Sequence, residues 1–154
     1  MKRVAIKAIC EQFTLKAPKP KKPSTIALKW WVVETTPNLV AALCFRPAAA
    51  ELALKQCAEA GSKIELPCTN DLAILSMECD DDSHEVAGVV LKTLSMDCSG
   101  GAICITLNVE HQDRRADIDF YYDGRGKMTE LVIAPAQGTL PGAKEDAAQV
   151  APRA

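Results

Sequence analysis

The sequence lacks the features by which membrane proteins and many enzymes are identified. No apolar run approaches the roughly 18 residues needed to span a bilayer. Lys7 and Glu11 interrupt the segment that follows the basic N-terminus, which argues against a signal peptide. No catalytic motif with fixed spacing is present, so we favour a non-enzymatic binding protein over an enzyme. We expect no cofactor and no membrane partner.

Cysteine spacings that indicate a disulfide framework are also lacking. The seven cysteines are an odd number, and no two have C-x-x-C spacing, whereas a disulfide framework has an even count. Most lie in apolar runs, where a free thiol behaves as a small hydrophobic side chain. A two-residue turn at 100–101 would place Cys98 opposite Ile103, which argues against a bond from Cys98 to Cys104. The pattern favours reduced core cysteines and a cytoplasmic location.

Length and hydrophobic periodicity indicate one domain. The chain has 154 residues, enough for a single substantial core. Residues 1–135 form the predicted globular domain, whereas 136–154 have no apolar period and are expected to be a disordered tail. Strands are predicted at 4–15, 26–33, 63–67, 72–78, 86–96, 102–109, 117–122 and 128–134, and helices at 38–45 and 47–60. A helix is the alternative at 72–78, because its apolar residues do not alternate cleanly and Asn70 or Asp71 could cap it.

These elements predict an α+β fold. We expect a mainly antiparallel sheet of six to eight strands, with two short helices inserted after the second strand. Turn residues at 99–101 and 123–126 predict that the last four strands form an antiparallel meander. A partly closed barrel is the main variant, because consecutive antiparallel strands can curl to hide their edges.

Charge is distributed unevenly along the chain. Residues 1–29 contain eight Lys or Arg and one acid, Glu11, so this part carries +7. Since the formal net charge is −2, the remainder carries −9. Such a division indicates a preference in partners or self-association rather than a fold.

A basic, proline-rich loop at 16–24 is the first candidate site. Its lysines are Lys16, Lys19, Lys21 and Lys22. The three prolines of this loop hold the chain extended and keep the ammonium groups apart, as an arm that follows phosphates requires. The next strand adds Lys29 and Trp31, whose ring could stack on a base. We therefore predict nucleic acid or another polyanion as the ligand. A soluble connection with no ligand is the simpler alternative.

An acidic stretch at 117–123 is the second candidate. As a strand it would place Asp117, Asp119, Tyr121 and Asp123 on one face. This face could serve a protein-interaction module, either an inhibitor or a subunit that assembles into a homo-oligomer by binding the basic loop of another copy. A third alternative is a metal-dependent enzyme, in which these carboxylates hold Mg²⁺ or Mn²⁺ with help from neighbouring acids or a histidine. A solvated sheet face is the simpler explanation.

Overall fold

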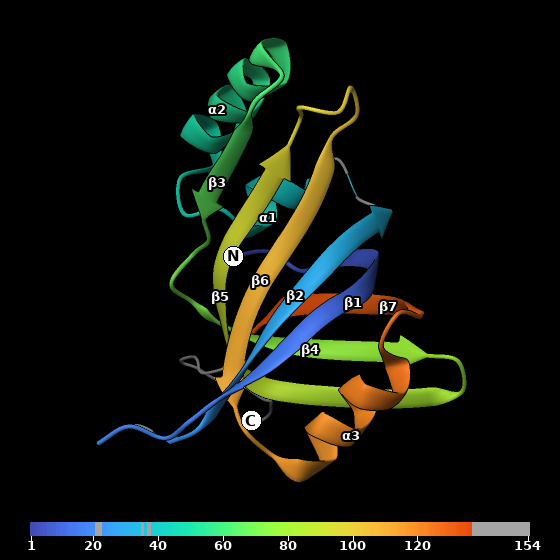
Figure 1. Ribbon diagram of the computed structural model, residues 1–154. Coiled ribbons are helices and arrows are strands. Elements are labelled where there is room, and N and C mark those ends of the chain that lie inside the picture. The colour runs from blue at the N-terminus through green and yellow to red at the C-terminus, as the bar shows by residue number, and fades with distance from the viewer. Residues whose placement is uncertain (21–22, 35, 37, 137–154) are drawn as a thin grey trace, which may run out of the picture.

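The fold is taken from a computed structural model that describes residues 1–20, 23–34, 36 and 38–136. Figure 1 shows the strands wrapped around a common core, with helices at its two ends. In chain order the elements are β1 (Val4–Lys16), β2 (Thr25–Glu34), α1 (Leu39–Leu43), α2 (Pro47–Ala60), β3 (Lys63–Pro67), β4 (Leu72–Cys79), β5 (Asp82–Asp97), β6 (Cys104–Gln112), α3 (Arg115–Gly124) and β7 (Met128–Pro135).

Six of the strands close into an antiparallel barrel. Their order is β5-β4-β7-β1-β2-β6, and β6 pairs with β5 to complete the ring. The remaining strand, β3, pairs with the C-terminal half of β5 beyond the end of β4. The predicted α+β, mainly antiparallel fold is confirmed, in its barrel variant. Closure removes the open edges that a flat sheet of these strands would expose.

The barrel interior is filled by the alternating apolar residues of its strands. In β2, Ile26, Leu28 and Trp30 are buried, whereas their neighbours face outward, as the period of two requires. The adjacent tryptophans lie on opposite faces of the sheet, because Trp30 is 1% exposed and Trp31 is 41% exposed. This alternation gives the barrel an apolar inside and a polar outside.

The two helices inserted after β2 lie at one end of the barrel (Figure 1). Pro47 begins α2, where its missing N–H costs no hydrogen bond. Gly61 ends it in the left-handed conformation, with φ of 64°. In α1, Leu39, Val40 and Leu43 are buried in the main core. The predicted positions of both helices are confirmed.

The predicted meander of the last four strands is wrong. β6 pairs with β5 as expected, but its other neighbour is β2. β7 lies between β4 and β1. Pairing β7 there joins the N-terminal hairpin to the rest of the sheet and closes the barrel. Local turn signals contain no information about such long-range pairing, which decided the topology.

The predicted strand at 117–122 is also wrong, because this segment belongs to α3. Alternation over so few residues also fits a helix, in which Asp117 and Tyr121 are one turn apart and share a face. Both side chains are buried against the barrel end. Asp117 in the first turn suits the positive end of the helix dipole. The segment is too short for its alternation to specify a strand, and the burial of Asp117 and Tyr121 against the barrel favours the helix instead.

The chain beyond β7 is described only as far as residue 136. The N–H of Ala136 donates to the carbonyl oxygen of Leu72, with an N···O distance of 3.0 Å. The predicted tail at 137–154 lies outside the described residues. Among the helices that are described, none has both the length and the apolar character needed to cross a membrane.

Candidate nucleic-acid interface

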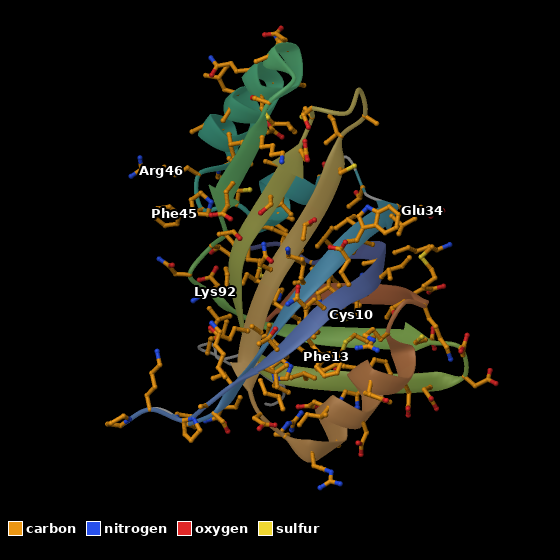
Figure 2. The ribbon with its side chains drawn as sticks, viewed as in Figure 1. Cys10, Phe13, Glu34, Phe45, Arg46 and Lys92 are labelled. Atoms are coloured by element: carbon orange, nitrogen blue, oxygen red, sulfur yellow. The ribbon has the colours of Figure 1, made fainter. Side chains whose placement is uncertain are left out.

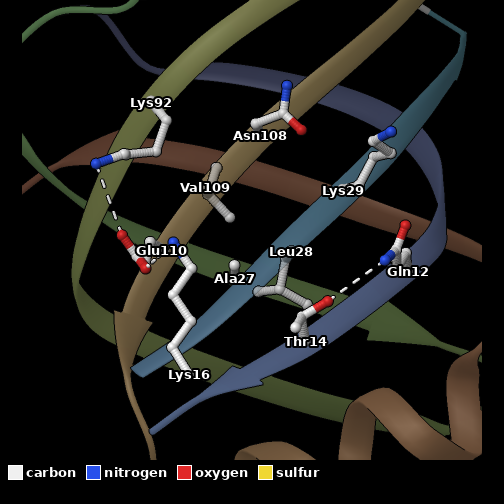
Figure 3. Close-up of a pocket in the computed structure, with 10 residues that line it drawn as sticks. All are labelled: Gln12, Thr14, Lys16, Ala27, Leu28, Lys29, Lys92, Asn108, Val109 and Glu110. Atoms are coloured by element: carbon white, nitrogen blue, oxygen red, sulfur yellow. Dashed lines mark hydrogen bonds and ion pairs between the residues drawn. The ribbon is translucent and has the colours of Figure 1, made fainter. Parts of the chain in front are cut away.

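A groove of about 400 Å³ that carries charged side chains lies on the outer surface of the barrel, across β1, β2, β6 and β5. Figure 3 shows its side chains. They are Gln12, Thr14, Lys16, Ala27, Leu28, Lys29, Lys92, Asn108, Val109 and Glu110. Three lysines and one glutamate give the groove a formal charge of +2. Two irregularities of the sheet build it.

The first irregularity is a bulge in β1. Cys10 pairs with Trp30 and Gln12 with Lys29, which leaves Glu11 as an extra residue. Cys10 is buried and Phe13 packs against the core, so the inward-facing positions are three apart instead of two. Figure 2 labels both residues on β1. The bulge reverses the phase of the strand. Gln12, and two residues later Thr14, therefore face the groove.

The second irregularity is a bulge in β5. Leu91 pairs with Val109 and Thr93 with Asn108, so Lys92 is the extra residue on this strand. Its side chain reaches along the outer surface until Nζ lies 3.6 Å from Oε1 of Glu110. Both bulges border the same groove, and bulges are common beside functional sites because they re-aim side chains.

Glu110 links two of the groove lysines. Its Oε2 lies 2.9 Å from Nζ of Lys16 and accepts a hydrogen bond from the hydroxyl of Thr25 at 3.1 Å. The hydrogen bond from Lys16 is the main reason that the pKa of Glu110 is lowered, with Thr25 and Lys92 adding to the effect against partial burial. The carboxylate is therefore ionised at neutral pH and holds two ammonium groups on either side of it.

The lysines remain more accessible than the glutamate that holds them. The side chains of Lys16 and Lys92 are 55% and 52% exposed, whereas that of Glu110 is 17% exposed. An ammonium group has three N–H donors, so one can serve Glu110 while others face solvent. An anion approaching from outside would meet the lysines before the carboxylate.

Lys29 and Trp31 extend the groove along β2. Lys29 lies between Gln12 of β1 and Asn108 of β6 in the sheet register. Trp31 is two residues further along the same face, about 7 Å away, and is paired with Thr106. The outer surface thus places an exposed indole next to Lys29 on the same face of β2.

The structure brings together part of the predicted basic site. Lys16 lies in β1 rather than in a loop, and it shares the groove with Lys29. Lys19 is exposed in the connection between β1 and β2, whereas Lys21 and Lys22 lie outside the described residues. Sequence reasoning missed Lys92, whose only signal was a charge in an otherwise apolar strand.

The acidic stretch divides between a buried cluster and the surface of α3. Asp117 is fully buried, and its Oδ2 accepts a hydrogen bond from Nε of Arg114 at 2.9 Å. A second hydrogen bond joins Arg114 Nη2 to Asp117 Oδ1, and Nε2 of His84 binds the same oxygen. Asp119 and Asp123 are exposed on the helix, one turn apart. The four residues therefore do not form the shared face that a strand would create.

Opposing effects set the pKa of Asp117. Burial alone would raise it, but the hydrogen bonds from Arg114 and His84 outweigh burial and lower the pKa below its ordinary value of 3.8. The Asp117 carboxylate is thus ionised in the folded protein at neutral pH. Because the partners of this carboxylate come from β5 and from the start of α3, the cluster fastens α3 to the barrel.

The second histidine completes the cluster. Nδ1 of His111 donates to the carbonyl oxygen of Gln112 at 2.8 Å, which leaves Nε2 to accept from the hydroxyl of Tyr121 at 2.7 Å. Burial lowers the pKa of His111, although hydrogen bonding to Gln112 and the charge of Asp117 oppose this effect. Burial also raises the pKa of Tyr121. Both groups are neutral at pH 7, as this hydrogen-bonding pattern requires.

Outward-facing glutamates gather on a different part of the barrel, on β4, β5 and β7. Glu78 and Glu130 are directly opposite in the register, and with Glu85 they line a groove of about 480 Å³. Within the part of the chain that the structure describes, no three His, Cys, Asp or Glu side chains are arranged to hold a metal ion.

Comparison with protein-family models, with curated proteins and with solved structures finds no match to this chain. The functional proposal therefore depends on geometry and charge.

Proposed function

We propose that this protein binds nucleic acid across the outer face of β1, β2 and β6. The observation that carries the proposal is the convergence of two bulges on one groove. They direct Lys92 and the side chains near Lys16 into a groove that Lys29 also lines, although these lysines come from three strands. A polypeptide gains nothing in core packing from gathering exposed lysines in this way, whereas a phosphate backbone supplies the missing negative charge.

The chemistry of the groove suits a single strand better than a duplex. Trp31 offers an exposed ring on which an unpaired base can stack. Asn108, Gln12 and Thr14 supply donors and acceptors beside the lysines. In a duplex the bases are already stacked on one another. We expect the phosphates to follow the lysines while one base lies over Trp31, with Lys19 adding a contact at the end of the hairpin.

The test is a salt titration of binding. Fluorescence anisotropy with a labelled 12-nucleotide single strand should give a logarithmic salt slope of about −2.8 if Lys16, Lys19, Lys29 and Lys92 each contact a phosphate. Changing Lys29→Ala or Lys92→Ala should each reduce the slope by about 0.7. Lys55→Ala, an exposed lysine on α2 with the same change of charge, is the matched control. No measurable binding at low salt, or equal effects of all three changes, would refute the proposal.

A second measurement separates nucleic acid from other polyanions. Trp31→Ala should weaken binding of the single strand by about 1–3 kcal/mol through loss of stacking. Heparin has no base to stack, so its binding should not change. If the variant binds both ligands as the unchanged protein does, the groove recognises charge alone.

A self-associating protein is the second candidate, favoured by the outward glutamates. Glu78 and Glu130 are like charges in directly opposite positions, and the neighbouring strand places one lysine, Lys7, opposite Glu130. The basic groove of another copy could supply the further positive charge that this acidic surface can accept. Light scattering should then show oligomers that dissociate as salt is raised. A monomer at low salt would remove this candidate.

A further inference from the structure

Four of the seven cysteines lie where α1, α2 and β3 join the barrel. They are Cys44, Cys57, Cys68 and Cys98, and all are buried. The proposed nucleic-acid interface uses none of them. Their arrangement in pairs could not be seen from the odd count in the sequence.

The first pair joins α2 to the end of β5. The Sγ atoms of Cys57 and Cys98 are 3.7 Å apart. The carbonyl oxygen of Ser62 accepts hydrogen bonds from the thiol of Cys57 at 3.2 Å and from the N–H of Cys98 at 2.8 Å. This shared acceptor holds both residues in place. A disulfide needs the sulfur atoms to approach to about 2.05 Å, a movement that rotation of the two side chains can supply.

The second pair joins the end of α1 to the end of β3. Cys44 and Cys68 form an isolated antiparallel bridge. The flanking hydrogen bonds run from the N–H of Phe45 to the carbonyl oxygen of Pro67 and from the N–H of Thr69 to that of Leu43. This pattern identifies a non-hydrogen-bonded pair, in which the Cα atoms are about 4.5 Å apart. That separation lies within the range that disulfides span.

We propose that Cys44–Cys68 and Cys57–Cys98 form two disulfides when the protein meets a disulfide oxidant such as oxidised glutathione. In each pair, one thiolate attacks the glutathione disulfide and releases one glutathione. The partner thiolate then attacks the mixed disulfide and releases the second. Two S–H bonds are lost, one protein S–S bond forms, and the oxidant is reduced to two thiols. The bonds would staple the helical segment to the barrel.

The environment of the thiols predicts slow exchange in the folded protein. Burial raises the pKa of Cys44 to about 11 and that of Cys68 to about 12. Few thiolates exist at neutral pH, and the oxidant must wait for local opening. Cys104 is exposed and reacts first, so its glutathione adduct is expected before either pair closes.

The experiment maps the bonds in the full chain. Reduced protein is incubated at pH 8.5 with oxidised glutathione, and a second sample is refolded in the same mixture. Free thiols are then blocked, and the chain is digested with trypsin without reduction. Mass spectrometry should find peptide 30–55 bound to 64–92 and peptide 56–63 bound to 93–114, each with the loss of two hydrogen atoms. Fragmentation should place the bonds at Cys68 and Cys98, with Cys79 and Cys104 of the same peptides outside them. The oxidised protein should unfold about 5 °C or more above the reduced form.

Variants assign the bonds and their specificity. Cys57→Ser should abolish only the bond from peptide 56–63, and Cys44→Ser only the bond from 30–55. Cys104→Ser, at an exposed position, should leave both bonds in place. If these variants fail to fold, the disulfide map of the unchanged chain still shows whether the two bonds form. A map that lacks either bond in both samples, or that instead pairs Cys98 with Cys104, would overturn the proposal.

Discussion

Asp117 and Glu110 are each held by several basic side chains, but their surroundings differ. Asp117 is fully buried, and its partners Arg114 and His84 join α3 to β5. Glu110 keeps 17% of its side chain exposed, and its lysines are more than half exposed. In the buried cluster the Asp117 carboxylate needs its partners because water cannot replace them. In the groove, water or an anionic ligand can replace Glu110 as the partner of the lysines. The same type of ion cluster therefore stabilises the fold in one place and remains available for binding in the other.

The largest expected effect is the loss of Asp117. Asp117→Ala should lower the free energy of unfolding by about 1.5–3 kcal/mol, since it removes the hydrogen bonds that Arg114 and His84 make to a buried anion. Glu110→Ala, the matched change in the groove, should cost less than about 1 kcal/mol because its partners are solvated. Urea unfolding followed by circular dichroism measures both. Equal losses would show that the two clusters do not differ as we describe.

The next effect is a loss of stability in acid that originates in the buried cluster. His111 has a pKa below its ordinary value of 6.5. As the pH falls, this imidazole is therefore protonated in the unfolded chain before it is protonated in the folded chain. The stability that neutral His111 contributes is complete above pH 6.5 and is lost as the pH falls through the folded pKa, by up to about 1.4 kcal/mol per pH unit. Urea midpoints measured from pH 8 to pH 5 should fall accordingly.

His111→Gln tests that assignment. The amide can still accept from Tyr121 and donate to Gln112, but it does not titrate. The slope between pH 6.5 and pH 5 should flatten. Asp117, whose pKa is also lowered, contributes stability that is present above its unfolded value and lost below pH 3.8. Its effect therefore appears only in stronger acid. An unchanged slope would exclude His111 as the source.

A smaller effect is expected in binding when the groove loses its glutamate. Glu110→Gln removes one negative charge beside Lys16 and Lys92, which should strengthen single-strand binding about fivefold at low salt, equivalent to about 1 kcal/mol. Glu78→Gln, the same change on the far glutamate surface, should alter binding by less than about twofold. Anisotropy titrations compare the two. A larger gain from Glu78→Gln would locate the ligand elsewhere.

The smallest effect is the coupling between Lys16 and Glu110. A double-mutant cycle of Lys16→Ala and Glu110→Ala should give a coupling of about 0.2–1 kcal/mol in stability, as is usual for exposed ion pairs. The corresponding cycle for Arg114 and Asp117 should give more, because Asp117 is fully buried. Coupling of similar size in the two cycles would mean that burial does not separate the clusters.

Some of this comparison could be predicted from the sequence, and some could not. The basic character of the first strands and the inward and outward tryptophans followed from local patterns. The helical form of the acidic stretch could not be predicted, because its short alternation fits a strand as well as a helix with Asp117 and Tyr121 on one face. Lys92 was missed because a bulge leaves no mark in composition or period. Each failure involves a contact between residues far apart in the chain.

By itself, the sequence determined the local elements and the charge of the N-terminal region. Alternating apolar residues specified strands such as β2, and Pro47 with Gly61 set the limits of α2, because these preferences act within a few residues. Only the tertiary structure decided the closure of the barrel, the helical form of α3, the grouping of Lys16, Lys29 and Lys92, and the pairing of four thiols. Those outcomes depend on which distant strands pair and where their registers shift, and the free energy that selects them comes from burial of the whole core.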